Sequence, residues 1–207
     1  MPCRPSHRDS SARDWRNRLA AALLHLTPTA LALLASAPLV APQNVAAAAP
    51  VENSKVKAAM VFHFTAFISW PEVAFAGSDA PLVLGIINDP ELESALREIV
   101  RRETVGGHPL SVVRCRTLDD ARAAHLVYVS RAEAGHLQGI LTGLGERPIV
   151  TVGEFEGFAE RGGMIELGTR AGGRVGLRIN PDAIKARNLS ASSKLLRLAE
   201  IVSSPQP

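Results

Sequence analysis

The stretch LVLGIINDPELESALREIV, residues 82–100, decides the fold of this chain. Its first six residues are apolar or Gly, which is typical of a strand covered on both faces. Asp89 is placed to cap a helix and Pro90 to open it, since Asp accepts hydrogen bonds from free N–H groups and Pro has none to lose. The helix that follows has one apolar stripe, and such a strand–helix unit predicts a parallel sheet with helices packed on it. The stripe consists of Leu92, Ala95, Leu96, Ile99 and Val100.

The rest of the chain continues this alternation through a short helix at 154–161, after which two strands follow each other directly. We therefore predict an α/β fold, with a mostly parallel sheet flanked by helices on both faces. A C-terminal antiparallel hairpin, turning at Gly172 and Gly173, and a final helix complete it. The expected strands are 110–114, 125–129, 148–152, 164–167 and 174–180, and the expected helices are 119–123, 133–144, 154–161 and a last one after Ser190.

The segment before the first strand, VKAAMVFHFTAFISW at residues 56–70, predicts a helix stopped by Pro71. Its polar residues Lys57, Thr65 and Ser69 form one narrow stripe, and apolar side chains cover most of the circumference. Such a helix needs burial on more than one side. The sheet provides one side, and a neighbouring subunit, a partner or a covering loop must provide the rest.

The first 48 residues differ in kind from all that follows. Five Arg precede an apolar run at 19–35, and small residues including Val45, Ala46 and Ala47 come next. This order predicts a secretory signal peptide with an Ala-rich cleavage region at 1–48, cleaved near Ala47, and a single exported domain at 53–203. An uncleaved membrane anchor is the alternative, but His25 and Pro28 interrupt the apolar run.

Removing the leader changes the charge of the protein. The leader holds five of the 23 basic residues and two of the 20 acidic ones, which leaves 18 of each in the exported part. A domain of zero net charge lacks the basic surplus that nucleic-acid binding requires. We expect no nucleic-acid partner.

No motif for catalysis, metal or cofactor binding is evident. The Gly pairs 106–107, 162–163 and 172–173 are turn signals, and none follows the first strand, where a phosphate-binding loop would lie. The exported part has four well-separated His residues without metal-ligand spacing. We expect no enzyme, metal or cofactor, and Cys115 is interpreted as a small buried hydrophobe or, alternatively, as an intermolecular pairing site.

Four segments carry a resemblance to a known family. They are the helix end FISWP at 67–71, the stretch GEFEGFAERGGMI at 153–165, the triplet Arg178-Ile179-Asn180, and the ending SSKLLRLA at 192–199. In order and spacing they resemble the YfiR-like family, over about residues 53–202. The better-known members carry paired cysteines, whereas Cys115 is alone here.

The resemblance implies a periplasmic, non-enzymatic regulator of cyclic-di-GMP signalling and biofilm formation. A YfiR-like protein binds the periplasmic sensory part of an inner-membrane diguanylate cyclase and represses it, which lowers cyclic-di-GMP. It also implies an α/β fold, a homodimer, and an outer-membrane lipoprotein that can sequester the repressor. The family has no catalytic residues to transfer to this chain.

Two candidate sites follow from the residues. A partner-binding surface is expected on the first and last helices, although aromatic and Leu stripes at helical spacing also pack inward as core. It comprises Phe62, Phe64, Phe67, Trp70, Leu195, Leu196, Leu198 and Ile201.

The alternative function is a small-molecule-sensing module that acts on another membrane partner. Its pocket is expected where the carboxyl ends of strands meet helix starts, which is where open α/β sheets bind ligands. The expected residues are Asn88, Asp89, Ser130 and Gly153. An undetected hydrolase is a third, weaker hypothesis.

Overall fold

The computed structural model describes residues 50–169 and 175–204. The predicted signal peptide at 1–48 and the predicted turn at Gly172 and Gly173 lie outside them. Within the described residues, no helix combines the length and the apolar character needed to cross a membrane.

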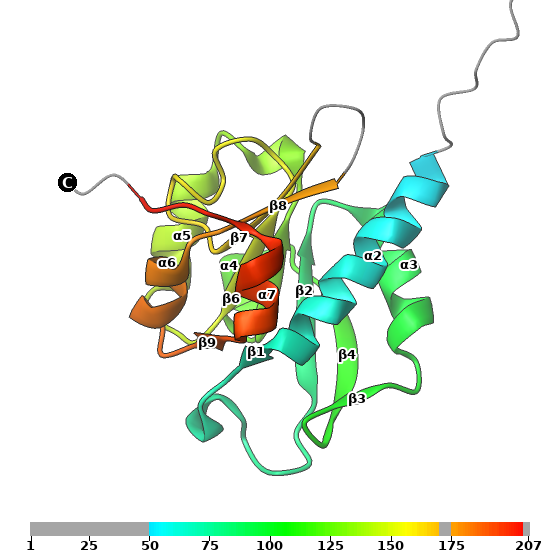
Figure 1. The fold of residues 1–207 in the computed structure, drawn as a ribbon. Helices are drawn as coiled ribbons and strands as arrows, with labels where there is room; N and C mark the ends of the chain where they lie inside the picture. The colour runs from blue at the N-terminus through cyan, green and yellow to red at the C-terminus, as the bar shows by residue number, and fades with distance from the viewer. Residues whose placement is uncertain (1–49, 170–174, 205–207) are drawn as a thin grey trace, which may run out of the picture. The chain divides into compact units, whose positions relative to one another are not determined.

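An eight-stranded sheet forms the centre of the domain, in the order β10-β8-β7-β6-β5-β2-β4-β3 (Figure 1). The five strands β4, β2, β5, β6 and β7 run parallel, and β7 and β8 form an antiparallel hairpin. The predicted fold class is therefore confirmed. The strands are β2 (Leu82–Ile87), β3 (Thr104–Val105), β4 (His108–Arg114), β5 (Leu126–Val129), β6 (Val150–Gly153), β7 (Ile165–Thr169), β8 (Val175–Ile179) and β10 (Glu200–Ile201).

Helices cover both faces of the sheet, because the central strands are apolar on both sides. One core lies between the sheet and α2, α3, α6 and α7, and a second core lies between the sheet and α4 and α5. Figure 1 shows α2, α3 and α7 in front of the sheet. The helices are α2 (Pro50–Phe67), α3 (Pro90–Val100), α4 (Leu118–Arg122), α5 (Leu137–Leu144), α6 (Pro181–Ala186) and α7 (Ser193–Leu198), with short 3₁₀ turns at Glu72–Ala74 and Arg131–Glu133.

The helix α3 begins as the sequence predicts. The side chain of Asp89 accepts a hydrogen bond from the backbone N–H of Leu92 at 2.9 Å, and Pro90 is the first helical residue.

The first helix ends three residues earlier than predicted. Ile68 and Ser69 leave the helix as β1 (Ile68–Ser69) and pair with β9 (Ser190–Ala191) in a two-stranded antiparallel sheet. The carbonyl of Phe67 accepts the backbone N–H of Ser192 at 2.8 Å. Tertiary pairing therefore ends the helix before Pro71 does.

The C-terminal third departs most from the prediction. Residues 154–161 form turns rather than a helix, with Gly157 at a φ of 79° and Gly162 at 99°. The helix α6 follows the hairpin unpredicted, capped by Asn180, whose side chain accepts the N–H of Ala183 at 3.0 Å. The last helix is short, so Ile201 lies on the edge strand β10, which pairs with β8 in parallel.

Candidate functional site

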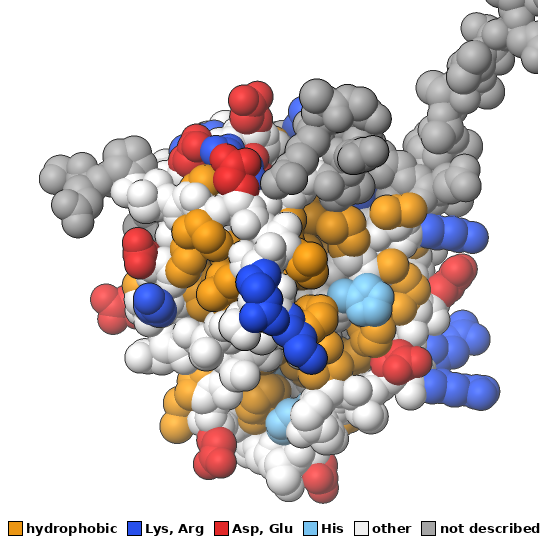
Figure 2. Space-filling view, in the orientation of Figure 1, with side chains coloured by type: hydrophobic (Ala, Val, Ile, Leu, Met, Phe, Trp, Pro, Cys, Tyr) orange, Lys and Arg blue, Asp and Glu red, His pale blue; other side chains and the backbone are white. Residues whose placement is uncertain are grey.

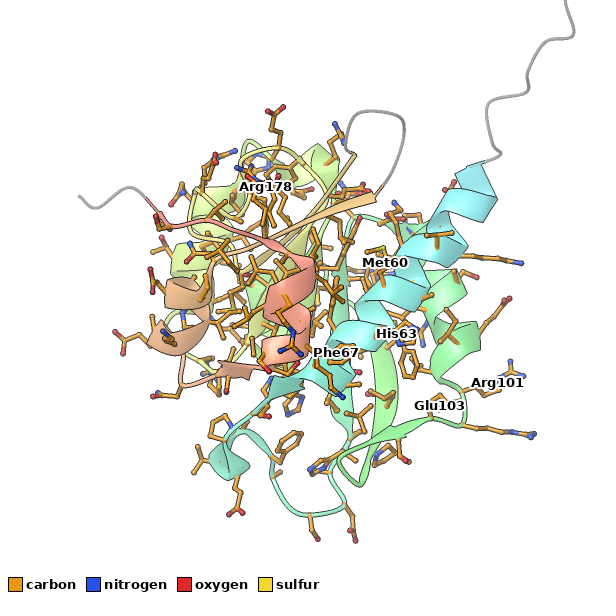
Figure 3. The ribbon with its side chains drawn as sticks, viewed as in Figure 1. Met60, His63, Phe67, Arg101, Glu103 and Arg178 are labelled. Atoms are coloured by element: carbon orange, nitrogen blue, oxygen red, sulfur yellow. The ribbon has the colours of Figure 1, made fainter. Side chains whose placement is uncertain are left out.

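An apolar groove lies between the first and the last helix. Its lining comes from both helices and from one strand beneath them, and its volume is about 360 Å³. Figure 3 shows Met60, His63 and Phe67 along the side of α2 that approaches α7. The α2–α7 groove is lined by Met60, His63, Phe64 and Phe67 of α2, Leu177 of β8, and Leu195 and Leu198 of α7.

The floor of this groove is core, whereas its rim is open. Phe64 and Leu195 are 3% and 2% exposed, but Leu198 is 71% exposed and Val56, one helical turn before Met60, is 48% exposed. Figure 2 shows hydrophobic side chains gathered over α2 and α7, with basic side chains on α7 and a histidine on α2 among them. Large exposed apolar side chains beside a hollow are typical of an interaction surface.

The structure brings together half of the residues predicted for a partner surface. Phe64, Phe67, Leu195 and Leu198 line the groove. Phe62 and Leu196 are partly buried against the core, and Ile201 is 53% exposed on β10. The lining residues Met60, His63 and Leu177 were not in the predicted set, because only the tertiary fold places β8 beneath these helices.

Trp70, the remaining predicted residue, anchors a different segment. Its indole N–H donates to the carbonyl of His125 at 3.1 Å, and the loop 71–81 follows. Within this loop, the ring of Phe75 stacks between His108 and His125, with centroid distances of 3.8 and 4.6 Å. The Nδ1 atom of His125 accepts the N–H of Val83 at 3.0 Å, and its Nε2 lies 3.1 Å from the carbonyl oxygen of Ala74. His125 therefore carries its proton on Nε2 and holds the loop as a neutral ring, and its burial lowers its pKa.

The predicted ligand pocket lies at the carboxyl edge of the parallel strands. The chain leaves β2 through α3 to β4 on one side, and then crosses through α4 to β5 on the other side. The strand order thus reverses between β2 and β5, where Asn88, Asp89 and Ser130 follow the strands. This is the position at which open α/β sheets bind ligands.

A cluster of charges fills the α2 side of this edge. The Nζ atom of Lys57 on α2 lies 3.1 Å from Oδ2 of Asp89 and 2.9 Å from Oε2 of Glu154, and 5.9 Å from the centroid of the Tyr128 ring. The three charged side chains are only 17%, 12% and 22% exposed. Burial alone would lower the pKa of Lys57, but the two carboxylates outweigh it and raise the pKa above its usual value. We call these three residues the Lys57 cluster.

The four predicted pocket residues do not surround one cavity. Asp89 belongs to the Lys57 cluster, and Ser130 is buried. The space above Gly153 is filled by Phe158, since a Cβ atom on Gly153 would lie 2.3 Å from that ring. Asn88 alone lines a cavity, of about 450 Å³, on the α5 side of β2 and β4.

That cavity is polar at its mouth and apolar beneath. Asn88 donates to Glu133 at 2.8 Å, and the side chains of Arg116, Thr117 and Ile140 also line it. Cys115 lies at its base, 6% exposed, and burial raises the pKa of its thiol to about 11. The interpretation of Cys115 as a small buried hydrophobe agrees with this position, and the raised pKa keeps the thiol protonated at neutral pH.

Among residues 50–169 and 175–204, no group of three or more His, Cys, Asp or Glu side chains could hold a metal ion. No sequence pattern indicates the Lys57 cluster. Lys57 and Glu154 are 97 positions apart, and only the fold brings them together.

A model of the YfiR/HmsC-like family matches residues 54–200, which is more than half of the chain. No curated protein matches. Among solved structures, a conserved domain protein from Vibrio cholerae O1 biovar El Tor strain N16961 is similar, with a TM-score of 0.47 and 13% sequence identity. The alignment covers 72% of this chain and 59% of that chain, so this chain spans less than two thirds of that protein.

Proposed function

This chain belongs to the YfiR/HmsC-like family, and from that membership we propose that it binds the periplasmic sensory part of an inner-membrane diguanylate cyclase and represses it. The family is one of periplasmic regulators of such cyclases and is regulatory rather than catalytic. Repression lowers cyclic-di-GMP and so restrains biofilm formation. Residues 1–48 act as a cleaved signal peptide that exports the domain at 53–203.

The observation that carries the proposal beyond the family is the α2–α7 groove. Apolar side chains that a fold leaves exposed together mark protein–protein interaction sites. Leu198 and Val56 are such exposed side chains, and they flank a hollow whose floor is rigid core. We assign the cyclase contact to this surface, including Phe67 and the neighbouring Ile201.

The test is cellular cyclic-di-GMP after deletion of the gene. Deletion is expected to raise cyclic-di-GMP, and an exported copy to restore it. A copy without residues 1–48, confined to the cytoplasm, is expected to fail. An unchanged level after deletion, or full rescue by the cytoplasmic copy, would contradict periplasmic repression.

A homodimer and an outer-membrane lipoprotein that sequesters the repressor are further parts of the proposal, supported by the family resemblance. Sedimentation of the exported protein at micromolar concentration tests the first. Relief of repression on co-expression of candidate lipoproteins tests the second. A monomer would contradict the homodimer, and repression that no lipoprotein relieves would contradict sequestration by a lipoprotein. Neither result would contradict cyclase binding.

Small-molecule sensing is the second candidate function, and the cavity beside Asn88 favours it. Its volume of about 450 Å³ lies within the range of small-molecule sites. A ligand that binds there would raise the melting temperature of the protein, and Ile140→Trp, which fills the cavity, would remove that rise. Flat melting curves across a metabolite panel would count against this function.

A further inference from the structure

The exposed charged side chains that the structure describes on the two helices of the α2–α7 groove are of one sign. They are Lys55 on α2, and Lys194 and Arg197 on α7, next to the lining residues Leu195 and Leu198. Among the side chains that the structure describes on these two helices, none is acidic. The next acidic residue, Glu200, lies on β10 and faces Arg178, with 3.6 Å between Oε1 and Nε.

These basic side chains are not engaged elsewhere in the described part of the chain. None of the ion pairs found there involves Lys55, Lys194 or Arg197. Figure 2 shows basic side chains over α7 with hydrophobic side chains on both sides of them. The surface therefore offers an apolar hollow and uncompensated positive charge together.

We infer that the α2–α7 groove receives an acidic amphipathic helix of a protein partner. Apolar side chains of that helix enter the groove beside Leu198, and its Asp or Glu residues meet Lys194 and Arg197. A helix laid into a groove between two helices presents anchors at i, i+3, i+4 and i+7 on one face, which suits an elongated apolar hollow. This inference rests on the proposed function, since it describes the partner of the same surface.

Charge argues against the groove of a second copy as the occupant. A twofold-symmetric pair brings the same patch of both copies together. Both copies would then bring Lys194 and Arg197 into the same interface, and like charges at an interface oppose association. Shape argues against a lipid surface, because a bilayer is flat and would leave the hollow over Phe64 and Leu195 unfilled.

The experiment compares two designed, fluorescein-labelled helical peptides. Both carry Leu at i, i+3, i+4 and i+7, and the positions between are Glu in one peptide and Lys in the other. Binding to the exported protein is measured by fluorescence anisotropy at low salt. We expect the Glu peptide to bind at least about tenfold more tightly, and rising salt to reduce the difference.

Charge reversal gives the decisive comparison. The double variant Lys194→Glu and Arg197→Glu is expected to reverse the preference between the peptides. The matched control is Arg101→Glu with Arg102→Glu, an exposed basic pair at the end of α3; Figure 3 shows Arg101 away from the groove. The control is expected to keep the preference, and circular dichroism verifies that both variants fold.

Several results would overturn the inference. Equal affinity for both peptides, or a preference that the double variant leaves unchanged, contradicts it. Binding of phosphatidylglycerol vesicles that the double variant abolishes, without peptide binding, would assign the surface to the membrane. Self-association that Leu198→Asp abolishes, without peptide binding, would assign it to a second copy.

The outcome is separable from the proposed function. If Glu-peptide binding is confirmed but Leu198→Asp leaves cellular cyclic-di-GMP unchanged, the inference stands and the assignment of cyclase repression to this surface fails. If Leu198→Asp abolishes repression but the two peptides bind equally, the proposed function stands and the acidic helix is wrong.

Discussion

The α2–α7 groove and the carboxyl edge of the sheet differ in whether the protein's own side chains fill them, and α2 contributes residues to both regions. At the carboxyl edge, Lys57 reaches Asp89 and Glu154 and fills the α2 side of the place where open α/β sheets bind ligands. About one turn further along the same helix, Met60 and His63 line a hollow that the described part of the chain leaves open.

The difference explains why α2 is apolar almost all round. One side packs on the sheet through Val61 and Phe64, and a second lines the groove. Lys57 is the main polar exception. It pairs with the carboxylates of Asp89 and Glu154, which would otherwise be partly buried without a counter-charge. The stretch 153–165, which supplies Glu154, thus helps to fill the carboxyl edge of the sheet, whereas the interaction surface lies on α2 and α7.

Phe158→Ala is expected to have the largest effect on stability, because it removes the buried ring that fills the space above Gly153. Phe158 is fully buried, fills the space above Gly153 and Gly163, and meets Phe155 edge to face at 5.3 Å. Its loss should reduce the free energy of unfolding by about 3–5 kcal/mol. Urea denaturation measures the change, with Val73→Ala, at an 89% exposed side chain, as the neutral control. A loss below about 1 kcal/mol would mean that the carboxyl edge tolerates a cavity.

Lys57→Met is expected to have the next largest effect, since it leaves two partly buried carboxylates unpaired. We expect the free energy of unfolding to fall by about 2 kcal/mol at pH 7, less than for a fully buried pair. Because the pKa of Lys57 is raised, the wild-type contribution persists below pH 10.5 and is lost as the pH rises through the raised value. Melting temperature from pH 7 to pH 11 measures the effect, with Lys55→Met as the exposed control.

The alkaline end of this series sharpens the test. The stability gap between Lys57→Met and wild type should narrow as the pH rises above 10.5 towards the raised pKa of Lys57. A gap that stays constant with pH would show that packing of the Lys57 stem, rather than its charge, holds the cluster together.

Acidification is expected to weaken the loop 71–81, with a smaller effect. His125 accepts the N–H of Val83 and must be neutral to do so, and its pKa lies below the usual 6.5. The unfolded chain therefore binds a proton first, so stability is full above pH 6.5 and falls as the pH drops towards the lowered value. Proteolysis of the loop between pH 7.5 and 5 measures this, and His125→Gln should show a flatter pH response. Equal acid sensitivity of both proteins would contradict the role of His125.

The sequence predicted the parallel sheet and the start of α3, because those features depend on local patterns. The run at 82–87 and the Asp89 cap act within a few residues of each other. The sequence could not predict that α2 ends at Phe67, because the competing hydrogen bond comes from Ser192. The prediction that Gly153 lines a pocket was wrong, because no sequence pattern indicates that the ring of Phe158 covers Gly153. Only half of the expected partner residues line the groove. Helical spacing shows which residues share a face of a helix, but only the fold decides whether another element covers that face.

Leu198→Asp is expected to have the smallest effect on stability and the largest on the proposed function. Its side chain is 71% exposed, so the free energy of unfolding should change by no more than about 0.5 kcal/mol. Leu195, three residues earlier on the same helix, is 2% exposed, and Leu195→Ala should cost about 2–4 kcal/mol. Urea denaturation of both variants, beside cellular cyclic-di-GMP, separates the roles: a folded Leu198→Asp protein that no longer represses places the cyclase contact at the open rim. A folded Leu198→Asp protein that represses normally would move the cyclase contact off the α2–α7 groove.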